Sequence, residues 1–189
     1  MLKIAITGNI ASGKSQVEKF IRELGYTVYD ADKIAHGVLD SITYFYGYDV
    51  FTDGKIDRKK LGNIVFSDTN LRNKLEKMTH PLIKLKILEL FEQNTDKNYV
   101  FVSVPLLYEA EFDNIFDLVL IITVNESTQL SRLMARNNLT VQEALLRMHT
   151  QMPQKEKIKK ADYIINNNSS LDNLKNSVYK FIGELKNKC

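Results

Sequence analysis

Apolar residues recur along the chain with two alternating periods, and the first change of period lies near the N-terminus. Leu2 to Ile6 form a short, nearly continuous apolar run of the kind that makes a buried strand. After a glycine-rich stretch, apolar residues follow the spacing of one helix face at Val17, Phe20, Ile21 and Leu24. Gly25 stands where a helix commonly ends. The pattern predicts a strand, a loop and a helix.

Four further apolar runs predict strands, at 27–29, 99–104, 118–124 and 163–166. The run 118–124 is the most apolar and is expected to be buried on both faces of a sheet. Residues 171–185 predict a C-terminal amphipathic helix. The order strand, helix, strand, helices, strand, helix, strand, helices, strand, helix predicts an α/β fold. We expect a five-stranded parallel sheet with helices on both faces.

The segment between the second and third predicted strands is too long for a simple crossover. Residues 33 to about 95 have mostly helical spacing, with a turn signal at 52–55. Pro81 is expected to break this helical stretch after His80, because proline disfavours a helical backbone in the residue before it. The segment therefore predicts an inserted helical region that covers the carboxyl edge of the sheet.

The glycine-rich stretch after the first strand fits the phosphate-binding pattern Gly-x-x-x-x-Gly-Lys-Ser. It consists of Gly8, Asn9, Ile10, Ala11, Ser12, Gly13, Lys14 and Ser15. The glycines let the backbone curl around an anion, with N–H groups and the positive end of the next helix facing phosphate oxygens. Lys14 is expected to reach the β- and γ-phosphates, and the Ser15 hydroxyl to bind Mg²⁺. We therefore expect this loop to bind a nucleoside triphosphate.

Composition narrows the possible functions without choosing one. The chain has 189 residues, of which 44% are hydrophobic and 26% charged, as in an ordinary globular domain. Its net charge of +3 gives no reason to expect a nucleic-acid or membrane partner. Cys189 is the single cysteine, which excludes an internal disulfide and a cysteine-rich metal site. Without a secretory signal or a membrane-length apolar run, we expect a cytoplasmic protein. As a separate expectation, the protein would be a monomer or a weak homo-oligomer.

Two carboxylates end the second predicted strand, at the sheet edge where α/β proteins bind ligands. Asp32 is expected to face this crevice and to handle an acceptor hydroxyl. Asp30 should point to the opposite face if the strand persists, and capping the next helix or bonding in the core suits it better.

Arginines follow the fourth predicted strand. Arg132 and Arg136 lie four residues apart, and so on one face of a helix predicted over 125–137. Arg147 lies on the next helix, which a capping box opens at Thr140. Because arginine binds phosphate oxygens through a planar fork, this hairpin predicts a lid over the phosphates. A solvated charged face would give the same spacing.

Together these motifs resemble those of the dephospho-coenzyme A kinase family over nearly the whole chain. Besides the loop, the family's Asp-Ala-Asp-x-Ile-Ala segment is similar to residues 30–35, and its Asp-Gly-x-x-Asp-Arg-x-x-Leu segment to 53–61, followed by Val65 and Phe66. Its Leu-Glu-x-x-x-His-Pro and Pro-Leu-Leu-x-Glu segments resemble 75–81 and 105–109. Its Gln-x-x-Arg-x-x-x-Arg and Ala-Asp-x-x-Ile-x-Asn segments resemble 129–136 and 161–166. The chain departs from the family pattern at several positions. Asn9 and Ala11 replace two glycines that are usual in the loop, Gln16 stands where Thr is common, and His36 stands where Arg is frequent. The segment 36–47 is also shorter than usual and rich in tyrosine.

The resemblance implies a phosphate-loop fold in three layers that phosphorylates the ribose 3′-hydroxyl of dephospho-coenzyme A with ATP and Mg²⁺. It implies a nucleotide-binding core over 1–32 and 96–189, a lid at about 126–151 and an acceptor-binding region over 33–95. The catalytic residues implied are Lys14, Asp32 and Arg136. The loop residues Gly8 to Ser15 would bind the nucleotide together with Arg132, Arg136 and Asn166. The acceptor would contact Asp32, His80, Pro105, Leu106, Glu109 and Arg147.

Some of these residues have plainer alternatives. His80 also suits a packed histidine, and Asn166 a turn. Glu109 and Ser103 are the acidic and polar candidates near the third predicted strand, and Glu109 would hold a Mg²⁺-bound water or an arginine. Another small phosphate-loop kinase, acting on a nucleoside monophosphate or a small metabolite, is the nearest alternative function. A GTP-dependent switch would need Asp-x-x-Gly and Asn-Lys-x-Asp motifs, and neither occurs. A non-catalytic nucleotide-binding module is disfavoured because Lys14, Ser15 and Asp32 are all present.

Overall fold

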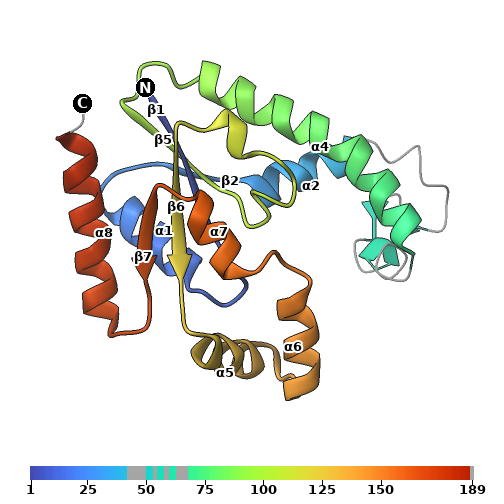
Figure 1. Cartoon of the computed structure of the whole chain (residues 1–189). Helices are drawn as coiled ribbons and strands as arrows, with labels where there is room; N and C mark the ends of the chain where they lie inside the picture. Colours follow the sequence, from blue (N-terminus) through green and yellow to red (C-terminus); the bar gives the residue numbers. More distant parts are fainter. Residues whose placement is uncertain (42–49, 53–54, 58–59, 63–67, 188–189) are drawn as a thin grey trace. The chain divides into compact units, whose positions relative to one another are not determined.

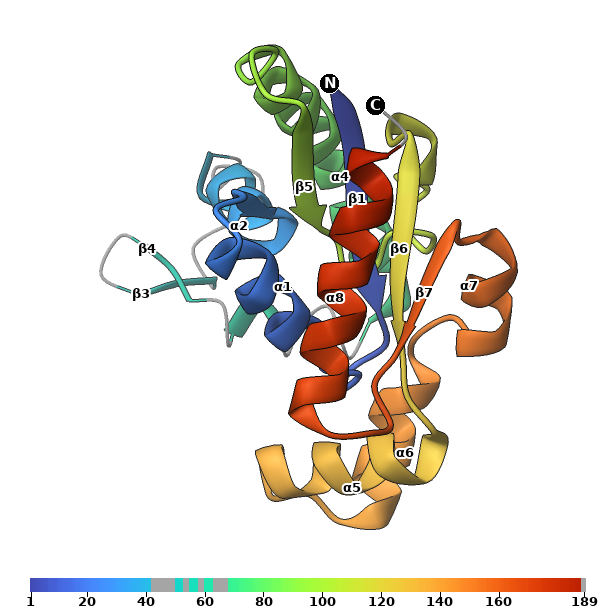
Figure 2. The same cartoon turned by 90° about the vertical axis from the view of Figure 1, so that its left-hand side faces the viewer.

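The computed structural model describes residues 1–41, 50–52, 55–57, 60–62 and 68–187. They form two compact units. The sheet unit comprises Met1–Tyr29 and Asn94–Cys189, and the helical unit comprises Asp30–Gln93. Figures 1 and 2 give two views of the ribbon. In the part of the chain described, no helix is both long and apolar enough to cross a membrane.

A five-stranded sheet is built in the order β2-β5-β1-β6-β7. Its strands are β1 (Leu2–Gly8), β2 (Val28–Asp30), β5 (Tyr99–Ser103), β6 (Leu118–Thr123) and β7 (Tyr163–Asn166). The central strand β1 runs parallel to both neighbours, and its Ile4 pairs with Phe101 on one side and Leu118 on the other. The predicted α/β fold with a parallel sheet is confirmed. All six residues of β6 are buried, as its unbroken apolar run predicts.

The helices of the sheet unit are α1 (Lys14–Glu23), α5 (Glu126–Asn137), α6 (Val141–His149), α7 (Gln154–Lys160) and α8 (Leu171–Lys186). Helices α1 and α8 pack against each other beside the sheet (Figure 2). Their apolar faces close a core around β1 and β6 that includes Ile6, Val17, Phe20, Ile122 and Phe181. Ser170 caps α8 by accepting a hydrogen bond of 3.2 Å from the Asn173 N–H. The predicted C-terminal amphipathic helix is therefore present.

The helical unit contains α2 (Ala31–Ser41) and α4 (Thr69–Glu92), which pack against each other. It also contains a small antiparallel pair, β3 (Phe51–Thr52) and β4 (Lys55–Ile56), which the helical prediction for this region missed. Asp68 caps α4 by accepting from the N–H groups of Asn70 and Leu71. Several predicted features lie outside the described residues: the turn residues Asp53 and Gly54, residues 58–59, Val65 and Phe66, and residues 42–47 of the short 36–47 segment.

Three details of the sequence prediction were wrong. Pro81 does not end a helix, because α4 continues through it to Glu92. A proline inside a helix removes one backbone hydrogen bond. The helix continues because Ile83, Ile87 and Phe91, beyond Pro81, still pack a buried face. The connection from β5 to β6 holds a short 3₁₀ helix (Asp113–Ile115) where a longer helix was expected, and α7 was not predicted as a separate helix.

Candidate functional site

The phosphate-binding loop lies between β1 and α1, as its sequence predicts. Gly13 has φ 92°, in the left-handed region that favours glycine, immediately before Lys14 begins the helix. A Cβ atom at Gly13 would overlap the side-chain amide of Asn167. A Cβ at Gly8 would lie 2.7 Å from the carbonyl oxygen of Ile122 and from the Ser12 hydroxyl. Both glycines are therefore required by close neighbours.

Asn167, the residue after β7, holds the loop through a hydrogen bond. Its side-chain nitrogen donates a 2.8 Å hydrogen bond to the Ser12 carbonyl, and its backbone N–H donates to the Thr123 carbonyl. The sequence motifs point instead to Asn166 as the nucleotide contact. The Asn166 side-chain oxygen accepts from the backbone and side chain of Asn168, a turn interaction. Three consecutive asparagines give no signal in the sequence that separates these roles.

Two loop positions that depart from the family pattern have distinct structural roles. Ala11 has φ 59°, a left-handed conformation that costs an alanine about 1–2 kcal/mol and a glycine almost nothing. The Asn9 side chain is 7% exposed and donates a 3.2 Å hydrogen bond to the Met152 carbonyl. A glycine at this position would lack that bond, so Asn9 adds a link between the loop and the chain beyond α6.

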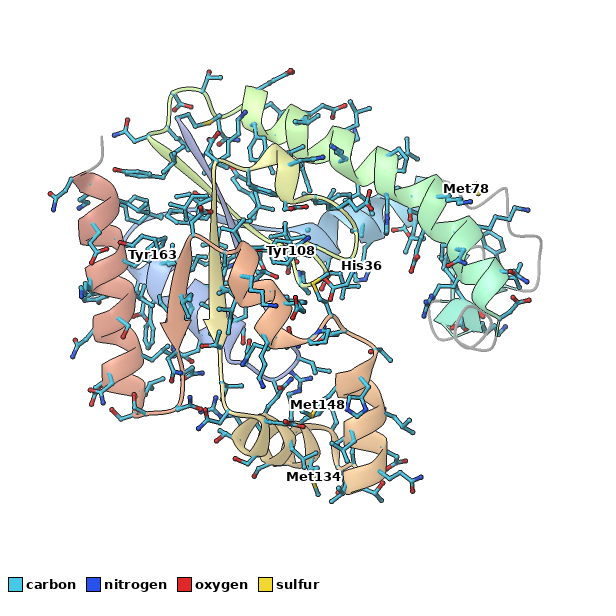
Figure 3. All side chains as sticks on the ribbon, viewed as in Figure 1. His36, Met78, Tyr108, Met134, Met148 and Tyr163 are labelled. Carbon is cyan, nitrogen blue, oxygen red and sulfur yellow. The ribbon has the colours of Figure 1, made fainter. Side chains whose placement is uncertain are left out.

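Glutamine side chains join the loop to the predicted lid. The Ile10 N–H donates to the Gln151 side-chain oxygen at 2.7 Å, and the Gln129 amide donates to the Ile10 carbonyl at 2.9 Å. Below them, Ile10 and Ala11 pack against an apolar cluster that includes Leu133 and Met148. Figure 3 shows Met134 and Met148 on the two helices of this hairpin. Gln129 begins the Gln-x-x-Arg segment noted in the sequence and Gln151 belongs to no motif. The sequence indicates a bracing role for neither, because their partners are backbone atoms distant along the chain.

The predicted lid is the hairpin of α5 and α6, which follows the carboxyl end of β6 (Figure 1). A capping box opens α6 as predicted, with bonds in both directions between Thr140 and Glu143. Hydrogen bonds from the Thr140 N–H and hydroxyl lower the pKa of Glu143, and Arg147 adds to this shift. The Glu143 carboxylate therefore keeps the cap intact down to more acidic pH than an unbonded glutamate would.

The three lid arginines differ in their surroundings. The Nη1 atom of Arg132 is buried and has no hydrogen-bond partner within the part of the chain that is described. It lies 3.9 Å from the position a Gly13 Cβ would take, and so beside the loop. Arg136 is exposed and donates to the Asn137 side chain at 2.9 Å, and Arg147 is exposed in the last turn of α6. Of the three, Arg132 has the surroundings of an anion-binding group.

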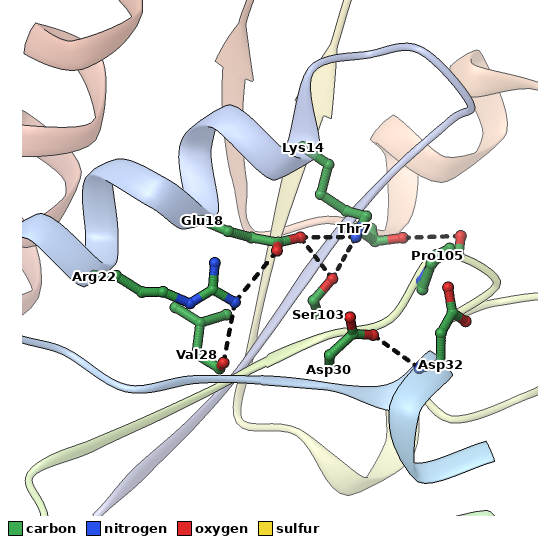
Figure 4. Close-up of polar contacts among 9 residues, drawn as sticks. All are labelled: Thr7, Lys14, Glu18, Arg22, Val28, Asp30, Asp32, Ser103 and Pro105. Atoms are coloured by element: carbon green, nitrogen blue, oxygen red, sulfur yellow. Dashed lines mark hydrogen bonds and ion pairs between the residues drawn. The ribbon is translucent and has the colours of Figure 1, made fainter. Parts of the chain in front are cut away.

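Lys14 is held by Ser103, a polar candidate in the sequence, and by Glu18, which the sequence motifs do not mark as part of the site. Its ammonium group lies 2.8 Å from a carboxylate oxygen of Glu18, one helical turn later, and also donates to the Ser103 hydroxyl at the end of β5. The Ser103 hydroxyl in turn donates to the same Glu18 oxygen at 2.7 Å (Figure 4). Glu18 is 7% exposed, whereas Ser15 is exposed at the start of the helix. Helical spacing alone makes Glu18 look like a surface partner of Lys14.

Asp30 and Asp32 belong to a strand-to-helix turn. The strand β2 ends at Asp30, and Asp32 lies in the first turn of α2, so its expected place on the strand was wrong. Asp30 accepts a 2.9 Å hydrogen bond from the Asp32 N–H, which makes Asp30 the cap of α2, as expected (Figure 4). The Asp32 side chain is exposed, and His80 is half-buried on α4. The acceptor-binding roles of Asp32 and His80 remain predictions.

The chain leaving β5 contains Pro105, Leu106 and Glu109. The Pro105 carbonyl accepts from the Thr7 hydroxyl at 3.4 Å, and Leu106 is 47% exposed. One oxygen of Glu109 accepts from the Met152 N–H at 2.9 Å and lies 2.8 Å from the ammonium group of Lys157. Lys157 is fully buried on α7. These contacts join the β5–β6 connection to α7 and to the chain that leads into it. The predicted contact of Glu109 with an acceptor stays a prediction.

Tyr108, next to Glu109, has a buried side chain whose hydroxyl has no hydrogen-bond partner among the described residues. Burial, together with the negative charges of Asp113 and Asp162, raises the pKa of Tyr108 to about 12. The Lys160 ammonium lies 5.3 Å from its ring centre. Tyr108 is therefore a neutral residue at physiological pH, buried within the connection between β5 and β6.

The fold and the loop define a phosphate-loop kinase. The structure is similar to shikimate kinase from Bacteroides thetaiotaomicron, with a TM-score of 0.59 over 98% of both chains at 17% identity, which indicates a shared fold. The model of the dephospho-CoA kinase family matches residues 2–173. The dephospho-CoA kinase of Listeria monocytogenes is 39% identical over 95% of this chain and 94% of its own. That of Campylobacter jejuni is 34% identical over 99% and 98%, with a TM-score of 0.77.

The chain belongs to the dephospho-CoA kinase family. With that membership comes dephospho-CoA kinase activity, the final step of coenzyme A biosynthesis. The resemblance read from the sequence motifs is confirmed, and the family is one that uses ATP. Family membership by itself assigns no role to an individual residue of this chain.

Proposed function

We propose that this chain transfers the γ-phosphoryl group of ATP to the ribose 3′-hydroxyl of dephospho-CoA, with Mg²⁺ bound to the nucleotide. The observation that carries the proposal is the loop from Gly8 to Ser15. It closes directly onto the N-terminus of α1 and is braced by Asn167 on one side and Gln151 on the other. A braced loop of this kind offers backbone N–H groups in fixed positions, so little order is lost when phosphates bind.

The nucleotide would lie on the loop, with Lys14 at the β- and γ-phosphates. Arg132 is the arginine that the surroundings favour for direct contact, because a buried cationic nitrogen without a partner is costly until an anion meets it. Arg136 is exposed on the same helix and would meet the transferred group when the lid engages its ligands. Asn166 would border the base, beside the Asn167 amide that supports the loop.

Magnesium fits the residues present as a metal carried by the nucleotide. Among the described residues, no three side chains of His, Cys, Asp or Glu lie close enough together to hold a metal ion by themselves. Mg²⁺ commonly keeps several waters and binds through substrate phosphates with few protein groups. The exposed Ser15 hydroxyl at the start of α1 would be a direct ligand. When bound, the metal neutralises charge on the phosphates.

Asp32 would orient the acceptor hydroxyl and take its proton. In the transfer, a bond forms between the ribose 3′-oxygen and the γ-phosphorus, and the bond from that phosphorus to the β,γ-bridging oxygen breaks. The electron pair leaves with ADP, and the hydroxyl proton passes to the Asp32 carboxylate. In a loose transition state, position matters more than early deprotonation, so an ordinary carboxylate suffices. Acceptor contacts are proposed for His80, Pro105, Leu106, Glu109 and Arg147.

A coupled assay for ADP release tests the choice of acceptor. The purified chain would be given ATP, Mg²⁺ and one acceptor at a time: dephospho-CoA, AMP, CMP or shikimate. We expect kcat/KM for dephospho-CoA to exceed that for each alternative by at least about 10³-fold, because a site built for one polar acceptor leaves groups unpaired with others. A higher kcat/KM with AMP, CMP or shikimate would replace the proposed reaction with that of another small kinase.

A further inference from the structure

The buried carboxylate of Glu18 has no part in the chemistry described so far. It lies on α1 with 7% of its surface exposed, close to the lysine that must meet the nucleotide phosphates. One of its oxygens accepts from Lys14 and Ser103, and the other lies 3.5 Å from Arg22. A buried carboxylate next to a triphosphate opposes nucleotide binding unless a cation compensates it.

Lys14 cannot compensate both Glu18 and the phosphates. Its ammonium group lies 2.8 Å from Glu18, and binding of the β- and γ-phosphates requires it to turn toward the loop. Glu18 then loses its strongest partner, while negative charge arrives nearby. Arg22 does not replace that partner well, because its contact with Glu18 is long and it also donates to the Val28 carbonyl at 3.1 Å.

The position of Glu18 suits the metal that enters with the nucleotide. Ser15 and Glu18 are three residues apart on α1, and side chains at this spacing share one face of a helix. Kinases and ATPases with this loop hold Mg²⁺ through the loop hydroxyl and an acidic residue. At the carboxyl end of β5, next to β1, this chain has the neutral hydroxyl of Ser103, and that hydroxyl is bonded to Glu18.

We propose that Glu18 is the acidic residue that holds the hydrated Mg²⁺ of the nucleotide, acting through metal-bound water and exchanging Lys14 for the metal when the nucleotide binds. Ser103 keeps the carboxylate in place during the exchange. The inference rests on the proposed use of Mg²⁺ at this loop. The acidic group that holds the metal would then come from α1, because β5 ends in Ser103 and has no carboxylate at that position.

The test measures ADP affinity by calorimetry, with Mg²⁺ and with EDTA, for the wild type, Glu18→Gln and Glu23→Gln. Glu23 is the matched control, because it lies on the same helix and its contacts are two exposed lysines, each 3.9 Å away. We expect Mg²⁺ to tighten ADP binding by the wild type and by Glu23→Gln equally. In Glu18→Gln this tightening should shrink by about 10-fold or more, as for other residues that contact a metal through its ligands. Affinity in EDTA should be equal or higher in Glu18→Gln, because Lys14 is released.

Metal binding is followed directly with Mn²⁺ and ADP by electron paramagnetic resonance, which does not depend on turnover. Glu18→Asp, which keeps the charge but shortens its reach, should fall between the wild type and Glu18→Gln. Unchanged tightening by Mg²⁺ in Glu18→Gln would overturn the inference and leave Glu18 as a counterion of Lys14, while the proposed reaction would stand. A parallel loss of affinity with and without metal would also overturn it. Absence of a metal effect in the wild type would contradict the proposed Mg²⁺ site itself.

Discussion

The ammonium group of Lys14 lies 2.8 Å from the carboxylate of Glu18, so the cation that should bind nucleotide phosphates is already paired within the chain. The pair is mostly buried, with side-chain exposures of 18% for Lys14 and 9% for Glu18. Ser103 donates to Glu18 and accepts from Lys14, which fixes both groups. On the proposed role of Lys14, nucleotide binding would exchange Glu18 for the phosphates as its partner.

Lys14→Ala should abolish most of the turnover. The variant removes the cation that we propose contacts the β- and γ-phosphates, and electrostatic groups of this kind commonly contribute about 10²-fold or more to kcat. Steady-state kinetics with ATP and dephospho-CoA measure the loss. Lys19→Ala is the control, since Lys19 is exposed on the same helix and its ammonium group lies 3.9 Å from Glu23. A Lys14→Ala enzyme with near-normal kcat would remove the loop from the mechanism.

The lid arginines should act on different states of the reaction. Arg132, buried beside the loop, should contribute to resting nucleotide affinity, so Arg132→Ala should raise the Kd of a non-hydrolysable ATP analogue. Arg136 is exposed, and Arg136→Ala should lower kcat more than it raises that Kd, as expected for a contact made in the transition state. Lys159→Ala, on an exposed face of α7, serves as the control. If neither arginine variant differs from this control, neither side chain contributes to nucleotide binding or to the transition state.

Asp32→Asn and Asp30→Asn separate catalysis from capping. Asparagine caps helices as well as aspartate does, so Asp30→Asn should leave α2 and turnover close to normal. Asp32→Asn keeps the shape but loses the proton acceptor, and kcat should fall by about 10²- to 10⁴-fold. The Kd for ATP, measured by calorimetry, should change by less than about threefold, since the proposed role of Asp32 is toward the acceptor and not toward ATP. Normal turnover in Asp32→Asn with a dead Asp30→Asn enzyme would mean that the carboxylates were assigned the wrong way round.

Glu109→Gln should lower the free energy of unfolding, in addition to any effect on turnover. It leaves the ammonium group of Lys157 fully buried without a counter-charge, and loss of one partner of a buried pair costs about 3–5 kcal/mol. The glutamine side chain of this variant would still accept from the Met152 N–H, so the loss of free energy of unfolding would reflect the missing charge and not a missing hydrogen bond. Urea unfolding of Glu109→Gln, Lys157→Met and the double variant measures the coupling. The double variant should recover much of the lost free energy of unfolding, and strictly additive losses would contradict the pair.

Much of the sheet unit could be predicted from the sequence because its strands are continuous apolar runs. The predicted strand at 163–166 coincides with β7, and the loop between β1 and α1 lies where its glycines indicated. The helical unit was harder to predict. A proline lies within α4, and the strands β3 and β4 have only two residues each, so neither feature leaves a clear periodic signal in the sequence. A residue before proline tends to avoid the helical conformation, and the packing of α4 on α2 outweighs this tendency at His80.

The parts of the site that escaped prediction depend on contacts between distant residues. Glu18 lies where an amphipathic helix would place a surface acid, yet it is buried and bonded to Ser103, 85 residues later. Asn167, Gln129 and Gln151 act on backbone groups of the loop, and such partners leave no pattern of spacing. The residues expected to contact phosphates could be read from a motif, whereas the residues that brace the motif could not.

The position of the transferred phosphate tests the account most directly. Dephospho-CoA would be incubated with ATP, Mg²⁺ and the purified chain, and the product examined by phosphorus–proton correlation NMR, with Lys14→Ala as the inactive control. We predict one new phosphomonoester signal, coupled to the proton on ribose carbon 3′, formed by the wild type and not by Lys14→Ala. A product phosphorylated at another oxygen, or no product under conditions in which ADP binds the wild-type loop, would contradict the proposed transfer to the 3′-hydroxyl.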